Sequence, residues 1–197
     1  MAKSAKGGQF ERDMARKLSF WWSGGKHDDL FWRASQSGGR ATVRGRKGQR
    51  TFGQCGDIAA THPDGQSLLD VVTIELKRGY SHSSFAELLD RPNHAATQPF
   101  EGFVIQAYSA CKLAKTPAWL LITRRDKKEC LIFMPKTLAD ALRLNGSRFQ
   151  KKGPRAELRV RIRMDEPEVM TIVGTTLDNF LKHTDPSHFH DIATPSH

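Results

Sequence analysis

The sequence has few cysteines, and they lie far apart: Cys55, Cys111 and Cys130 among 197 residues. Three scattered cysteines do not indicate a disulfide framework, and no Cys/His pair has the spacing of a structural zinc site. Reduced thiols are typical of the cytosol, so we expect a cytoplasmic protein.

Long apolar segments are also lacking. No run approaches the roughly 20 apolar residues that a membrane-spanning helix needs. The first twenty residues are charged and hold no apolar core of signal-peptide length. We therefore expect neither secretion nor a membrane partner. A chain of 197 residues can form one domain with a substantial core and a small appendage.

Acidic residues are outnumbered: 21 Asp/Glu stand against 31 Lys/Arg, a formal net charge of +10. The excess is uneven along the chain. Residues 1–50 hold twelve Lys/Arg and four Asp/Glu, whereas residues 51–100 hold three and six. A basic segment beside an acidic one is typical of a nucleic-acid enzyme with a carboxylate metal site. A generally basic, solvated surface is the alternative.

The N-terminal part predicts a helix, a short strand and a basic loop. Phe10, Met14 and Leu18 recur every four residues, which predicts an amphipathic helix over 9–22. A short strand is expected over 30–35. The glycine-rich segment after it carries five basic residues between positions 40 and 50 and no acid up to position 56. It is either a solvated loop or a segment that binds DNA phosphates.

Residues 57–62 and 68–79 have the composition of strands, and the turn residues "PDGQ" between them predict a β-hairpin. Side chains alternate along the second strand, so Leu76 faces one way while Glu75 and Lys77 face the other. Apolar residues on both faces over most of its length indicate a central strand that is covered on both sides.

The following elements alternate between helices and strands. The expected order is a short helix at 85–90, a helix at 100–115, a hairpin of strands 118–125 and 130–135, and a helix at 137–144. On the longer helix, Gln106 faces either the site or the polar rim. This order predicts an α/β fold with a mixed sheet.

A small ββα extension is expected after a polar linker over 145–156. It comprises strands at 157–164 and 168–174 and a helix at 175–183. In the first strand three arginines alternate with Val160, Ile162 and Met164. The extension either continues the sheet or forms a separate lobe. The predicted boundaries are 1–145 for the main domain, 146–183 for the extension and 184–197 for a disordered tail.

Three charged side chains are expected to meet at one end of the predicted hairpin, because Asp57 opens one strand and Glu75 and Lys77 close the other. Two convergent carboxylates form an oxygen-rich site that suits Mg²⁺ with most of its waters retained. Such an ion lowers the pKa of bound water and neutralises charge on a phosphate. Lys77 can hold the attacking water or stabilise the transition state. Glu11, on the first helix, can complete the metal shell or orient its waters.

The pattern "Gly56-Asp57 … Glu75-Leu76-Lys77", after a helix with Glu11, resembles the PD-(D/E)XK nuclease superfamily. Within it, residues 6–135 are similar to the archaeal Holliday-junction resolvases and to phage-type endonucleases. Arg33 and "SGG" (37–39) stand where those proteins have a strand-ending arginine and a Ser-Gly loop. Gly56 replaces the proline of the superfamily name, and segments 40–54 and 78–99 are longer than in compact resolvases.

The resemblance implies a restriction-endonuclease-like mixed sheet flanked by helices, with Mg²⁺-dependent hydrolysis of DNA phosphodiester bonds. Mn²⁺ is expected to substitute for Mg²⁺. Catalytic roles are implied for Glu11, Asp57, Glu75 and Lys77, and metal binding for Asp57, Glu75 and Glu11. The expected DNA contacts are Arg33, Ser37, Arg40, Arg44, Arg46, Lys47 and Arg50.

The resemblance leaves the DNA substrate open. A resolvase-like enzyme would act as a homodimer, because two symmetric strands are cut. A restriction-type or repair nuclease is the alternative within the same class. A DNA-binding recombination accessory protein without catalysis is the alternative outside it. The Glu75/Lys77 pair argues against the last, since burying a charge pair without a metal or substrate costs stability.

Overall fold

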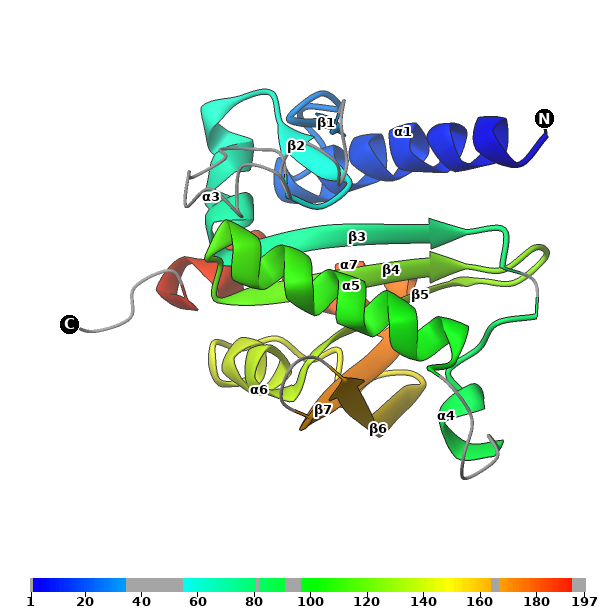
Figure 1. The fold of residues 1–197 in the computed structure, drawn as a ribbon. Coiled ribbons are helices and arrows are strands. Elements are labelled where there is room, and N and C mark those ends of the chain that lie inside the picture. Colours follow the sequence, from blue (N-terminus) through cyan, green and yellow to red (C-terminus); the bar gives the residue numbers. More distant parts are fainter. Residues whose placement is uncertain (1, 35–54, 81, 91–96, 164–166, 193–197) are drawn as a thin grey trace.

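A computed structural model describes residues 2–34, 55–80, 82–90, 97–163 and 167–192 (Figure 1). Its centre is a five-stranded sheet in the order β3-β4-β5-β7-β6. The strands are β3 (Val72–Arg78), β4 (Ala118–Arg124), β5 (Cys130–Pro135), β6 (Arg155–Arg163) and β7 (Pro167–Thr176). Strands β3 and β4 are parallel, and the other neighbours are antiparallel. The predicted α/β class with a mixed sheet is confirmed.

Helices cover both faces of this sheet, as a restriction-endonuclease-like fold requires. Helix α5 (Pro99–Ala114) packs on one face of β3 and β4 (Figure 1). Val104 and Trp119 are buried on this face. The opposite face carries the larger core, to which α1 (Ala2–Trp22), α6 (Lys136–Leu144) and α7 (Leu177–His183) contribute. No helix in the described part of the chain is both long and apolar enough to cross a membrane.

The predicted hairpin of 57–62 with 68–79 is wrong. Strand β2 (Ile58–Ala60) pairs antiparallel with β1 (Phe31–Arg33) in a separate two-stranded sheet, and helix α3 (Pro63–Val71) lies between β2 and β3. The residues interpreted as a turn begin this helix. The His62 side chain accepts a hydrogen bond from the Asp64 N–H, and Pro63 occupies the first helical position, where its missing N–H costs nothing.

The predicted elements between residues 85 and 144 are confirmed within two residues at each end. They are α4 (Glu87–Asp90), α5, the antiparallel hairpin of β4 and β5, and α6. Helix α5 is capped by the left-handed residue Lys115, and Pro117 follows two positions later. Strong periodicity and clear end signals therefore located these elements well.

The C-terminal extension continues the sheet, because β7 pairs with β5 over five residue positions. The predicted linker is packed rather than loose, since Phe149 is fully buried against Phe180 of α7. The predicted disordered tail is wrong as far as Ile192. A 3₁₀ helix, η1 (Pro186–Ile192), buries Phe189 against the end of α1. Residues 193–197 and Met164 lie outside the described part of the chain.

Candidate active site

Asp57 lies along the free edge of β3, the outermost strand of the sheet. Its N–H donates to the Ile74 carbonyl at 2.8 Å, and its Oδ2 accepts from the Leu76 N–H at 2.8 Å. The carboxylate therefore takes the place of a backbone partner beside Leu76. Asp57 and Glu75 become neighbours through this edge contact and not through the expected hairpin.

Gly56 is required by the close approach of the chain to β3. Its φ is +84°, and a Cβ atom there would lie 2.7 Å from the Ile74 carbonyl oxygen. Proline fixes φ near −65°, so it cannot occupy this position in the observed conformation. The departure from the superfamily pattern at Gly56 thus has a backbone cause, and the same conformation places Asp57 beside the strand.

Glu75 and Lys77 lie on the face of β3 that α5 covers, as the strand alternation predicted. The Lys77 Nζ atom donates to Glu75 Oε2 at 3.2 Å, and Gln106 of α5 donates to the same oxygen at 3.1 Å. Only 4% of the Glu75 side chain and 12% of the Lys77 side chain is exposed. The sequence allowed Gln106 to face either the site or the polar rim, and the contact with Glu75 shows that it faces the site.

Burial and a second carboxylate raise the pKa of Glu75 to about 7. Desolvation is the main cause, Asp57 adds to it, and Lys77 acts in the opposite direction. With both acids ionised, the site holds two adjacent negative charges and one compensating lysine. Such a set of hard oxygen donors favours a divalent cation, whose charge would restore the ionised form of Glu75.

Glu11 approaches the site from α1 and is held by Arg33 of β1. The Arg33 Nε atom lies 3.6 Å from Glu11 Oε2. Desolvation and then Asp57 raise the pKa of Glu11, whereas Arg33 and Lys77 lower it. Gly8 leaves room for this pair, since a Cβ there would lie 2.9 Å from Arg33 Nη1. Arg33 therefore contacts a site carboxylate, although the sequence predicted it as a DNA contact.

The three predicted metal-binding carboxylates do not converge as one ligand set. Across the described ranges, no three His, Cys, Asp or Glu side chains form a group that could hold a metal ion. Asp57 and Glu75 are adjacent, and the charge of Asp57 reaches Glu11 and raises its pKa. An ion at this pair would take its remaining ligands from water or from a phosphate, which suits Mg²⁺.

Six predicted DNA contacts cannot be placed, because they lie outside the described residues: Ser37, Arg40, Arg44, Arg46, Lys47 and Arg50. One further neighbour of the site, on β4, was not predicted from the sequence. Thr123 pairs in register with Lys77 across the two parallel strands. Only the strand pairing brings these two residues together, so no local pattern could have indicated it.

Residues 2–191 match a family model described as "Phage putative PDDEXK endonuclease". No curated protein and no solved structure matches the chain significantly. The matched range includes α1, the Asp57/Glu75 edge and the C-terminal extension. The match extends beyond residues 6–135, so the extension is part of the family's sequence pattern.

Proposed function

This chain belongs to the family of phage PDDEXK endonucleases, and we propose that it is a Mg²⁺-dependent enzyme that hydrolyses phosphodiester bonds of DNA. One observation carries the proposal. Asp57 and Glu75 are buried side by side at the edge of β3, and Lys77 contacts Glu75 at 3.2 Å. Two acids and a lysine in this arrangement are the groups that such hydrolysis needs.

Asp57 and Glu75 would hold the ion. When bound, Mg²⁺ supplies a more acidic water and neutralises charge on the phosphate. Glu11 would orient waters of the site from α1, which is the alternative that the observed geometry favours over direct binding. Mn²⁺ offers the same preference for oxygen ligands and is expected to support activity.

Lys77 and Gln106 have separate tasks in this proposal. A lysine ammonium has three N–H donors, and one of them is used on Glu75. The remaining donors can hold the attacking water or stabilise the negative charge that develops on the phosphate. Gln106 is a positioning residue, because its contact with Glu75 Oε2 fixes the orientation of that carboxylate.

The test is cleavage of labelled linear duplex, single-stranded, forked and four-way-junction DNA, with Mg²⁺ and with EDTA. We expect metal-dependent cleavage by the wild type and none by Asp57→Asn or Glu75→Gln. Both variants should still bind DNA, because each removes a negative charge. Asp64→Asn is the matched control, since 70% of that side chain is exposed on α3, and it should cleave normally.

The substrate panel also separates the alternatives. A preference for the four-way junction, together with a homodimer in solution, would indicate a resolvase-like enzyme. Cleavage of linear duplex would indicate a restriction-type or repair nuclease. Binding without cleavage in either Mg²⁺ or Mn²⁺ would overturn the nuclease proposal and leave the DNA-binding accessory protein.

The basic residues between 40 and 50 are proposed to bind DNA phosphates. Replacing Arg44, Arg46 and Lys47 together with alanine should weaken DNA binding. The dependence of affinity on salt should also become shallower, because fewer counterions are released. Unchanged affinity and an unchanged salt dependence would assign this segment to the solvated surface.

A further inference from the structure

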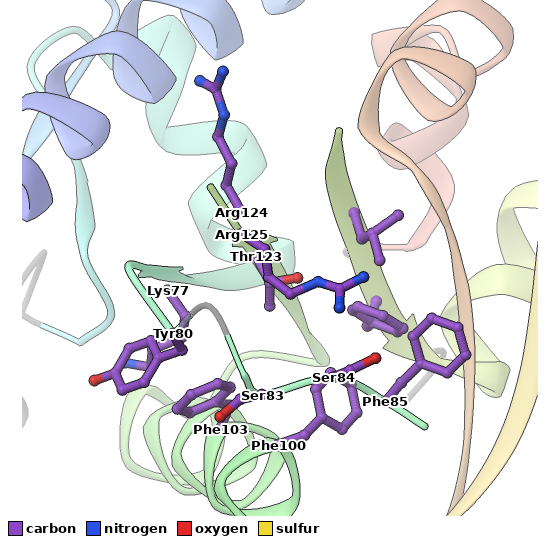
Figure 2. Close-up of a pocket in the computed structure, with 12 residues that line it drawn as sticks. Lys77, Tyr80, Ser83, Ser84, Phe85, Phe100, Phe103, Thr123, Arg124 and Arg125 are labelled. Carbon is purple, nitrogen blue, oxygen red and sulfur yellow. The ribbon is translucent and has the colours of Figure 1, made fainter. Parts of the chain in front are cut away.

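A pocket lies next to Lys77, at the carboxyl ends of β3 and β4 (Figure 2). The segment that leads from β3 to α5 forms one side of it. It is open to solvent, and its accessible space of about 20 Å³ takes little more than a water molecule, so a larger group would lie across its mouth. Lys77 and Thr123 form its border with the active site, since they are register partners on the two parallel strands. A nucleotide at this mouth would adjoin the phosphate that the site cleaves.

Aromatic rings make up a large part of the pocket wall. Five of its twelve lining residues are Phe or Tyr. Tyr80 and Phe103 lie side by side, with ring centroids 4.6 Å apart, and Tyr80 is 49% exposed. Phe100 and Phe133 form the buried floor, with centroids 4.9 Å apart. Such surfaces bind flat rings, and aromatic faces of this kind stack with nucleobases irrespective of sequence.

The charge of the pocket suits a nucleic acid. Two of its lining residues, Lys77 and Arg125, bring cationic side chains to it, the Arg124 side chain points away from it, and none of the twelve is acidic (Figure 2). Ser83 and Ser84 add hydroxyl groups at its edge. A nucleotide combines a flat aromatic base, polar base edges and a negative phosphate, and this pocket offers a partner for each.

The loop that forms one wall is held in place by Glu87 of α4. One carboxylate oxygen accepts from the Ser84 N–H at 3.0 Å, and the other accepts from the Phe100 N–H at 3.1 Å. This carboxylate thus ties the loop to the first turn of α5. The part of the wall at Ser84 and Phe100 is therefore in place before any ligand binds, so little ordering of this part would be needed on binding.

We propose that the base of an unpaired nucleotide next to the cleaved phosphate binds across the mouth of this pocket, with the exposed ring of Tyr80 as its stacking partner. The inference rests on the proposed nuclease function and deepens it. The preferred substrate is DNA with an unpaired nucleotide at the cut, because a base inside a matched duplex must first leave the stack.

The experiment measures binding in EDTA, so that it does not depend on cleavage. Three DNAs are compared by fluorescence anisotropy: a matched duplex, the same duplex with an unpaired nucleotide, and that DNA with the unpaired nucleotide made abasic. The abasic DNA keeps the flexible backbone and lacks only the base. Because base–aromatic stacking is a strong contact, the wild type should bind the DNA with the unpaired base about tenfold more tightly than the other two.

The variants test the stacking partner. Tyr80→Ala should bind all three DNAs equally, whereas Tyr80→Phe keeps the ring and should keep the preference. Phe20→Ala is the matched control, because Phe20 is an aromatic residue of similar exposure, 46%, on α1 and outside the pocket. It should also keep the preference. Equal affinity of the wild type for the unpaired and abasic DNAs would overturn the proposal, as would a preference that survives in Tyr80→Ala.

Cleavage of the same DNAs in Mg²⁺ distinguishes this inference from the nuclease proposal. Cleavage without a preference for the unpaired base would overturn the pocket and leave the nuclease. A base preference in binding, with no cleavage in Mg²⁺ or Mn²⁺, would leave the pocket and overturn the nuclease. Absence of binding to all three DNAs would overturn both.

Discussion

Glu75 is buried against a second carboxylate, and its pKa of about 7 follows from that position. Protonation below this pH would remove one of the two negative charges that attract the metal. We therefore predict that the cleavage rate rises as the pH increases through about 7. A bound cation favours the ionised carboxylate, so a higher Mg²⁺ concentration should move the midpoint of the profile to lower pH.

Initial cleavage rates between pH 5 and pH 9, at a low and a high Mg²⁺ concentration, would measure both effects. Asp64→Asn should reproduce the wild-type profile, because this acid lies on the exposed surface of α3. A rate that does not change with pH, or a midpoint that stays fixed when Mg²⁺ is raised, would contradict the role assigned to Glu75.

The orientation of the site side chains was predictable only where strand alternation determines it. Glu75 and Lys77 share one face of β3, as a two-residue period requires. The contact between Gln106 and Glu75 was beyond local patterns, because it joins residues 31 positions apart through the packing of α5 on β3. Periodicity predicted which way each side chain points, and tertiary packing determined which side chains meet.

At the scale of the elements, the chain just before β2 lies close against β3, and this close approach depends on Gly56. Replacing it with alanine imposes a left-handed backbone on a residue with a Cβ atom and forces that atom against the Ile74 carbonyl. We predict a loss of about 2–4 kcal/mol in the free energy of unfolding, because backbone strain and the steric clash add. Asp57 should also be displaced, and cleavage should be lost.

Gly25→Ala separates the two contributions. Gly25 has nearly the same φ, +87°, but a Cβ there would meet nothing within 4 Å. It should cost only about 1 kcal/mol, the penalty of the left-handed conformation. Urea denaturation of both variants supplies the comparison. Equal losses for Gly56→Ala and Gly25→Ala would show that the close contact with Ile74 has no energetic consequence.

Helix α3 shows why one element was predicted wrongly. The stretch after His62 contains proline, aspartate and glycine, which are common in turns, but it also carries the signals of a helix start. Leu68 and Val71 recur at a spacing of three and are buried, which supports the helix. Turns and helix starts favour the same residues. Here the packing of α3 against β2 and β3 stabilises the helix.

At the scale of the whole molecule, the last described residues complete the core around the first helix. Trp21 of α1 contacts Phe180 of α7 and Phe189 of η1, with ring centroids 5.9 Å apart in both pairs. The Trp21 Nε1 atom donates to the Thr184 carbonyl at 2.8 Å. The sequence could not indicate this contact, because it joins residues more than 150 positions apart.

The predicted boundary at residue 145 raises the question of whether the chain unfolds in one step or two. We predict one cooperative transition, because β7 pairs with β5 and Phe189 packs on α1. In scanning calorimetry the calorimetric and van't Hoff enthalpies should agree. Phe189→Ala should cost about 3–5 kcal/mol and lower the single midpoint by roughly 10 °C.

Phe20→Ala is the control for this substitution, because that ring is 46% exposed on α1 whereas Phe189 is buried. It should change the free energy of unfolding by less than about 0.5 kcal/mol. Two separate transitions, of which Phe189→Ala shifts only one, would show that the extension folds independently of the nuclease core. A single shifted transition would mean that the extension stabilises the strands that carry the active site, since the strands β3 to β7 all belong to the same sheet.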